Sequence, residues 1–270
     1  MARENPPAQQ VLTAVLFLLT AMIGAVALAY PFLLPLTAGP NPNDSLLRAN
    51  ETPLLAALLI GMCLAVLLVE LQGQAAGAKT VAALGVLVAI TAILRFIEVA
   101  IPGPGGFSPI FAPIIVSGYV FGPRFGFLMG AMTLLVSAII TAGVGPWLPY
   151  QMFTAGWIGL TAGWLPHLSR PKLELSLLIG FGFAWGFLYG AVMNLYTWPF
   201  LVGDPAMTWE PGAGLAGGLS RYAIFYMATS FVWDSIAAFG NALLLIILGI
   251  PTIRALNRFR DRLQLHVAAT

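Results

Sequence analysis

Residues 95–151 have the sequence RFIEVAIPGPGGFSPIFAPIIVSGYVFGPRFGFLMGAMTLLVSAIITAGVGPWLPYQ, in which two uncharged loops separate apolar segments. The first loop, Ile101–Ser108, is rich in proline and glycine, and the second, Gly143–Gln151, holds proline, tryptophan, tyrosine and glutamine. Two apolar segments joined by a tight turn at Gly122–Arg124 lie between them, so we expect both loops at the same end of the helices. Because loops without charge gain little from bulk water, we interpret them as the rim of a binding pocket for a small, partly apolar molecule.

The composition is that of an integral membrane protein. Hydrophobic residues make up 59% of the chain and charged residues only 8%, whereas soluble domains carry about 25% charged residues. A backbone in hydrocarbon must form its hydrogen bonds internally, which leaves helices or a closed barrel. The apolar runs are continuous and do not alternate as barrel strands do, so we predict an all-α integral membrane protein.

Eight apolar segments are expected to form the helices. They span residues 10–36, 53–70, 79–100, 108–121, 124–143, 151–166, 174–198 and 220–250. Segments 108–121 and 151–166 are shorter than the roughly 20 residues needed to cross a bilayer upright, so we expect them to lie partly against other helices. We divide the chain into two appended N-terminal helices (1–72), a six-helix core (73–252) and a basic tail (253–270).

The basic residues predict the orientation in the membrane. With eight crossings, nine of the twelve Lys and Arg residues fall on one side: Arg3, Lys79, Arg124, Arg170, Lys172, Arg254, Arg258, Arg260 and Arg262. The positive-inside rule places both termini in the cytoplasm and makes loops 37–52, 101–108, 143–150 and 199–219 external. This count keeps the first segment, because it is long for a signal sequence even though Ala27-Leu28-Ala29 resembles a cleavage site.

The sequence has few features of an enzyme, a metal-binding protein or a nucleotide-binding protein. The single Cys63 excludes an internal disulfide, and both histidines, His167 and His266, lie outside the apolar runs, which argues against a His-based metal site in the membrane. The chain has no phosphate-binding G-x-x-x-x-G-K-[ST] loop and no nucleophile–base pair. We therefore expect no cofactor, no metal site, no enzymatic activity and no nucleic-acid partner.

Ionisable residues inside apolar segments are the first binding candidates, because charge is costly in the bilayer and usually functional there. Arg95 and Glu98 are three apart, share a helix face and can pair. Arg95 either contacts a ligand, braces the loop 101–108, or extends to the outer headgroups. Asp234 either pairs with Arg95 or caps a buried backbone group, or it bounds the floor of the pocket.

Polar and aromatic residues extend the candidate site. The last segment carries a stripe at spacings of four, four, four and seven: Tyr222, Tyr226, Ser230, Asp234 and Asn241. Rings near a membrane interface commonly form a belt, but Gly-Pro-Trp-Leu-Pro-Tyr-Gln at 145–151 could also stack on a flat ring and contact its edge. The substrate-binding candidates are Arg95, Glu98, Phe107, Trp147, Tyr150, Gln151, Asn194, Tyr222, Tyr226 and Asp234.

Small residues at helical spacing mark faces where helices approach closely in lipid. The first row is Gly122, Gly126 and Gly130; the second is Gly182, Gly186 and Gly190, continuing to Asn194 and Trp198; the third is Ala82, Gly85, Ala89 and Ala92. We interpret the two glycine rows as contacts that hold the bundle together. The third row is either a similar packing face or a surface for a partner.

From about Lys79 to Arg262 the chain resembles the substrate-binding (S) component of energy-coupling factor (ECF) vitamin transporters. The resemblance rests on the six-segment layout and on three local sequences, Phe121–Gly126, Gly145–Met152 and Gly240–Leu243, the last followed by Pro251 and Arg254. It implies an S-component-like six-helix bundle, here with two extra N-terminal transmembrane helices, in the cell membrane of a prokaryote.

The resemblance also implies a function and partners. The protein would capture a vitamin through the external loops and deliver it with a coupling membrane subunit and cytoplasmic ATPases, surrounded by membrane lipid. The family's Ala-x-x-x-Ala docking motif matches Ala78 and Ala82 literally, and Gly85 and Ala89 only as small residues. The aromatic loops suit a ring-bearing vitamin of the corrinoid, flavin or thiamine type. The alternative is a stand-alone secondary transporter or channel for a small apolar solute.

Overall fold

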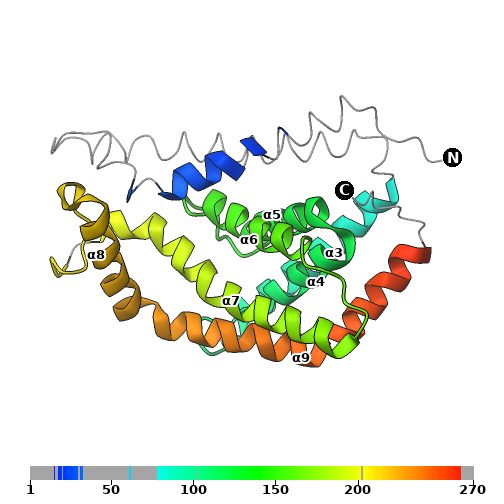
Figure 1. Cartoon of the computed structure of the whole chain (residues 1–270). Coiled ribbons are helices and arrows are strands. Elements are labelled where there is room, and N and C mark those ends of the chain that lie inside the picture. The colour runs from blue at the N-terminus through cyan, green and yellow to red at the C-terminus, as the bar shows by residue number, and fades with distance from the viewer. Residues whose placement is uncertain are drawn as a thin grey trace.

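The computed structural model describes residues 78–101, 103–201 and 203–262, together with residues 15, 18, 19, 21–29, 31, 32 and 61. Every regular element within these residues is a helix (Figure 1). The helices are α3 (Ala78–Ala100), α4 (Phe111–Phe121), α5 (Pro123–Ile140), α6 (Leu148–Ala162), α7 (Pro171–Thr197), α8 (Gly214–Thr229) and α9 (Phe231–Arg262). Short 3₁₀ turns occupy Trp198–Phe200 and Pro211–Ala213.

The helix lengths confirm the prediction of an all-helical membrane protein. Within the described residues, four helices are long and apolar enough to cross a bilayer: Thr80–Ala100, Pro123–Ile140, Pro171–Phe200 and Phe231–Asp261. Helix α4 is shorter and almost entirely buried, as expected for segment 108–121. The segment predicted at 53–70 lies outside the described residues, apart from residue 61.

The turn between α4 and α5 consists of one residue. Gly122 has φ +92° and closes α4 through its backbone N–H to the Gly118 carbonyl oxygen. A positive φ suits glycine, and Pro123 then occupies the first helical position, where proline is tolerated because no hydrogen bond is lost. The tight turn predicted at Gly122–Arg124 is thereby confirmed.

Segment 220–250 is not one helix, so the prediction of a single last segment was wrong. Helices α8 and α9 meet at Ser230, whose φ of −126° departs from helical geometry. Its backbone still accepts the Asp234 N–H, at 2.9 Å, while its side chain is bonded to Asn194 at 2.6 Å. Helix α9 then continues through Pro251 to Arg262, so the predicted tail begins as helix.

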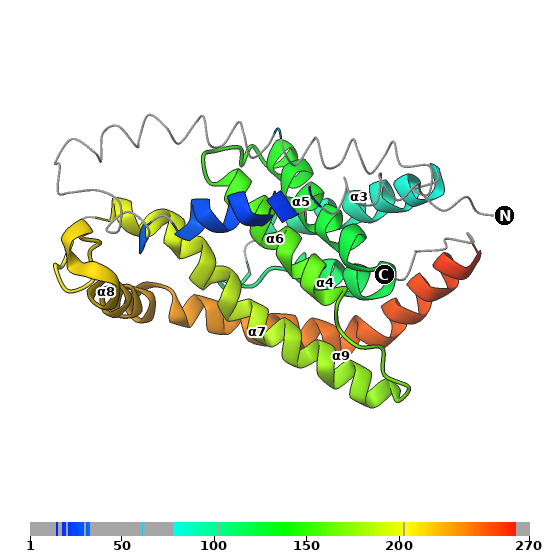
Figure 2. The same cartoon turned by 45° about the horizontal axis from the view of Figure 1, so that its top comes forward.

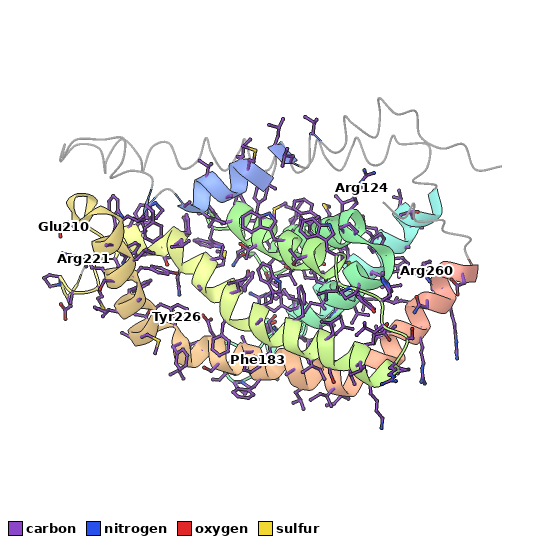
Figure 3. All side chains as sticks on the ribbon, in the orientation of Figure 1. Arg124, Phe183, Glu210, Arg221, Tyr226 and Arg260 are labelled. Atoms are coloured by element: carbon purple, nitrogen blue, oxygen red, sulfur yellow. The ribbon has the colours of Figure 1, made fainter. Side chains whose placement is uncertain are left out.

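The two ends of the bundle differ in charge. At one end Tyr119 of α4 donates to Glu174 of α7 at 2.7 Å, and Arg260 of α9 donates to the Val120 carbonyl oxygen at 3.1 Å. Arg124 lies at that same end, opposite Glu210 and Arg221 (Figure 3). In the loop before α4, Gly106 lies against Trp233, near the start of α9 and therefore far along that helix from Arg260.

The described part of the N-terminal segment lies against the core (Figures 1 and 2). The backbone at Gly24 faces the rings of Phe153 and Trp157 on α6. Nearby, the Trp209 indole N–H donates to the Pro31 carbonyl oxygen at 2.9 Å, and the ring of Phe32 contacts Trp198 with a centroid distance of 5.7 Å. This segment therefore touches the core on both α6 and the α7–α8 connection.

Candidate functional site

Helix α7 lies in the middle of the candidate site and presents two different faces. One face carries Tyr189, Met193 and Tyr196 at spacings of four and three, which place them on the same side of a helix. The other carries Gly182, Gly186, Gly190 and Asn194. The first face meets α4 and α6, and the second meets α8 and α9.

The first face of α7 forms an aromatic row. Tyr189 packs on Phe111 of α4 with a ring centroid distance of 4.7 Å, and Tyr196 packs on Tyr150 of α6 at 4.6 Å. Between them the Thr154 hydroxyl lies 3.7 Å from the Met193 sulfur. These side chains offer flat, polarisable surfaces with polar tips, which suits contact with a ring.

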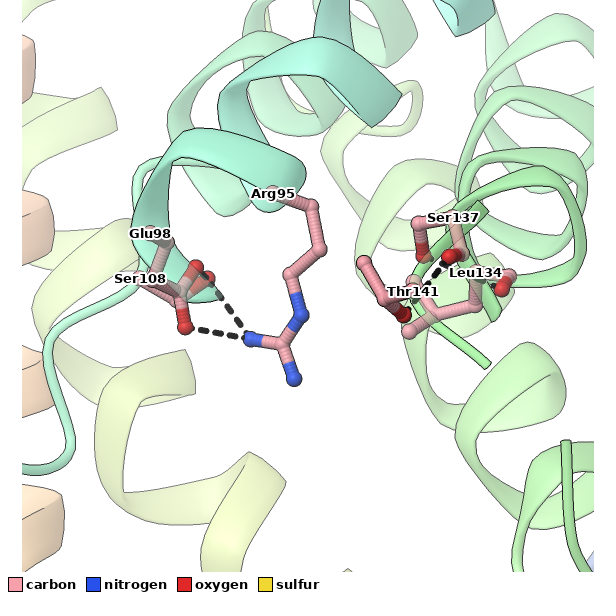
Figure 4. A network of polar contacts seen from close by, with 6 residues as sticks. All are labelled: Arg95, Glu98, Ser108, Leu134, Ser137 and Thr141. Carbon is pink, nitrogen blue, oxygen red and sulfur yellow. Dashed lines mark hydrogen bonds and ion pairs between the residues drawn. The ribbon is translucent and has the colours of Figure 1, made fainter. Parts of the chain in front are cut away.

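A polar cluster lies at the end of α3 (Figure 4). Arg95 Nη1 donates to Glu98 Oε1 at 2.5 Å, which confirms that these residues pair. The Ser108 hydroxyl donates to Glu98 Oε2 at 2.6 Å, and Arg95 Nη1 lies 3.4 Å from the Ser108 oxygen. Because Ser108 precedes α4, the cluster fastens the first loop to α3.

The charges of this cluster cancel, but its side chains remain partly accessible. Arg95 and Glu98 cancel in charge, and their side chains keep 29% and 18% of their surface accessible. Tyr189 of α7 lies close enough to interact electrostatically with both. Across from Arg95, the Thr141 hydroxyl donates to the Ser137 carbonyl oxygen at 2.8 Å, near the end of α5 (Figure 4). The arrangement offers hydrogen-bonding groups to the polar atoms of a small molecule.

The second face of α7 packs antiparallel against α8 and α9, along what we call the seam. The contacts pair Gly182 with Asn241, Gly186 with Ala238, Gly190 with Asp234 and Asn194 with Ser230. The Asn241 amide donates to the Gly182 carbonyl oxygen at 3.1 Å. The polar stripe predicted on the last segment therefore faces the glycine row predicted on α7.

Asp234 is not the partner of Arg95, which pairs with Glu98 instead. Its carboxylate lies against Gly190. Asp234 Oδ2 and the Tyr226 hydroxyl are both buried without a hydrogen bond of normal geometry to the described residues, although the two groups interact electrostatically. The seam thus holds a carboxylate and a hydroxyl that face each other and have no other partner among the described residues.

The remaining predicted residues lie at several places. Phe107 packs onto Gly240 of α9, and Tyr222 donates to the Ala191 carbonyl oxygen of α7. Trp147 is 43% exposed and donates to the Gly143 carbonyl oxygen of its own loop at 3.2 Å. Gln151 is half-buried in the first turn of α6.

The structure therefore divides seven of the ten candidates between two sides of α7. Arg95, Glu98 and Tyr150 lie on the side of the aromatic row, whereas Asn194, Tyr222, Tyr226 and Asp234 lie along the seam. Sequence reasoning missed Tyr189, Met193 and Tyr196. Their spacing of four and three was visible in the sequence, but nothing there indicated which neighbour that face meets.

Comparison with protein families places the chain. A family model described as "ECF transporter, substrate-specific component" matches residues 79–250. No curated protein and no solved structure gave a significant match. The matched range covers all of α4 to α8, most of α3 and α9, and both the polar cluster and the aromatic row. The chain belongs to the family of substrate-specific components of ECF transporters.

Proposed function

We propose that this protein captures a vitamin or related micronutrient at the outer face of a prokaryotic cell membrane. It then delivers the molecule with a coupling membrane subunit and cytoplasmic ATPases. The observation that carries the proposal is the position of the Arg95–Glu98–Ser108 cluster and the aromatic row. Both lie near the end of α3 and the starts of α4 and α6, whereas Arg124 is near the start of α5 and Arg260 near the end of α9, within a chain of the S-component family.

The orientation follows from the charges. Among the described residues, the end opposite the site carries Arg124, Arg170, Lys172, Arg254, Arg258 and Arg260. Basic residues near membrane spans favour the cytoplasmic side. Both termini are then cytoplasmic, and the polar cluster opens outward. A site on the outer side can bind the cargo before the cargo reaches a partner on the cytoplasmic side.

The surface of α3 is the proposed docking site for the coupling subunit. Ala82, Gly85 and Ala89 are exposed, and a side chain added at Gly85 would meet nothing within 4 Å. Ala92, in contrast, is fully buried. Ala78 begins the same helix. Small exposed residues let a partner helix approach closely, so Gly85→Leu should prevent co-purification of the coupling subunit while the isolated chain remains folded.

The test of the proposed function is uptake. Cells that express this chain with its coupling subunit and ATPases should accumulate the cargo, and deletion of the ATPases should abolish uptake. Mass spectrometry of small molecules that co-purify with the chain alone would identify candidates among corrinoid, flavin and thiamine-type vitamins. Uptake into liposomes by this chain alone would instead support a stand-alone secondary transporter or channel.

A further inference from the structure

Only part of the Arg95 guanidinium takes part in hydrogen bonds. Its Nη1 carries the bonds to Glu98 and Ser108, and among the described residues Nε and Nη2 have no partner. Figure 4 shows the guanidinium extending from α3 with its other edge turned away from Glu98. The Nε and Nη2 hydrogens form a planar fork that binds two neighbouring acceptors at once.

We infer that the cargo binds this fork through an uncharged ring edge with two adjacent hydrogen-bond acceptors, such as a carbonyl oxygen beside a ring nitrogen. The inference rests on the proposed function and specifies the chemistry of its cargo. It follows from the number of donors left free and from the charge that surrounds them.

Arg95 disfavours a cationic group at this position. A cation would lie beside the guanidinium and be repelled by it, and Glu98, the group that could attract it, already accepts from Arg95 at Oε1 and from Ser108 at Oε2. The free groups of Arg95 are hydrogen-bond donors, and donors require acceptors on the cargo.

Glu98 also disfavours an anion. It already neutralises Arg95 at 2.5 Å, so a carboxylate or phosphate would add an uncompensated negative charge to a half-buried site. Asp234, on the other side of α7, adds a further carboxylate to this end of the bundle. A neutral acceptor edge satisfies the fork without that cost.

The aromatic row supplies the complementary surface for a ring. Tyr189 packs on Phe111 at a ring centroid distance of 4.7 Å and is near enough to Arg95 to interact with it electrostatically. Tyr196 and Tyr150 continue the row at a centroid distance of 4.6 Å. A planar ring held at its edge by the fork would lie near side chains suited to stacking.

The experiment compares the cargo retained by purified full-length variants. The chain is expressed without its coupling subunit and ATPases, purified in nanodiscs, and extracted for quantitative mass spectrometry. Wild type should retain a molecule that is uncharged at pH 7 and carries two adjacent ring acceptors. Arg95→Lys keeps the charge but removes the planar fork, and its occupancy should fall about tenfold or more, the effect of losing one hydrogen bond to a charged group.

Arg221→Lys is the matched control, because Arg221 pairs with Glu210 at 2.5 Å outside the aromatic row. Its occupancy should equal that of wild type, and size-exclusion profiles should show all three proteins folded. A retained carboxylate, phosphate or cation, retained lipid alone, or unchanged occupancy in Arg95→Lys would overturn the inference. Uptake that still depends on the ATPases would leave the proposed function standing in each of these cases.

Discussion

The α5–α6 pair and the α7–α9 pair are both antiparallel and both contain glycines spaced by four, but different groups lie opposite those glycines. In α5–α6, Gly126 faces the backbone of Gly159, and Gly130 faces the backbone of Ala155. In α7–α9, Gly186 faces the Ala238 backbone, whereas Gly190 faces the carboxylate of Asp234. Backbone contacts cannot adjust to added volume, while the end of a side chain can rotate away.

The difference teaches that one sequence signal marks two kinds of interface. The α5–α6 interface is buried, since most residues of both helices are buried where the helices meet. The seam holds polar groups, and three of their atoms have no hydrogen bond of normal geometry among the described residues: the Tyr226 hydroxyl, Asp234 Oδ2 and Asn241 Oδ1. Because α7 carries the aromatic row on its other face, we regard α5–α6 as the fixed part of the bundle and the seam as its adaptable part.

The largest effect is expected in the fixed pair. In Gly159→Ala the new methyl group would collide with the Gly126 backbone, and overpacking that cannot relax costs the upper end of about 1–3 kcal/mol or more. Thermal unfolding of the detergent-purified protein, followed by size exclusion, measures the loss. Gly180→Ala is the control, because a side chain there would meet nothing within 4 Å; equal melting of the two variants would contradict the comparison.

The same substitution in the seam should cost less. In Gly190→Ala the atoms nearest to the methyl group belong to the Asp234 carboxylate, which can rotate, so we expect a loss of about 1 kcal/mol, the low end for overpacking. The assay is the same thermal unfolding, with Gly186→Ala as the comparison inside one helix, because Gly186 faces the Ala238 backbone. A Gly190→Ala loss as large as that of Gly159→Ala would show that the seam is also rigid.

Asp234→Asn should stabilise the seam slightly. The change removes a half-buried charge that has no ion pair among the described residues, while the amide oxygen can still accept from the Tyr226 hydroxyl. Relief of the cost of burying that charge is worth about 1 kcal/mol. Thermal unfolding measures the change in stability. The amount of cargo retained tests whether Asp234 bounds the floor of the pocket: full retention would show that it does not, and reduced retention would show that it does.

The sequence predicted those features that depend on spacing along one helix. The spacing of three from Arg95 to Glu98 was enough to expect a pair, and a spacing of four was enough to find both glycine rows. It could not indicate that the glycine row of α7 and the stripe with Asp234 face each other, because that requires knowing which helices are neighbours. The break at Ser230 and the role of Tyr189 were missed for the same reason, since both depend on contacts across helices.

The smallest effect concerns the N-terminal segment, which touches both helix pairs: Gly24 lies on α6, and Phe32 contacts Trp198 beyond α7. Trp209→Phe keeps the ring but removes the indole donor to the Pro31 carbonyl oxygen. Because only one partly exposed hydrogen bond is lost, the free energy of unfolding should change by no more than about 0.5 kcal/mol. Hydrogen exchange of residues 203–213 should nevertheless become faster, since that bond ties them to the N-terminal segment. Trp164→Phe, at an exposed indole, should leave the same peptides unchanged, and identical exchange in both variants would show that the N-terminal segment does not restrain the α7–α8 connection.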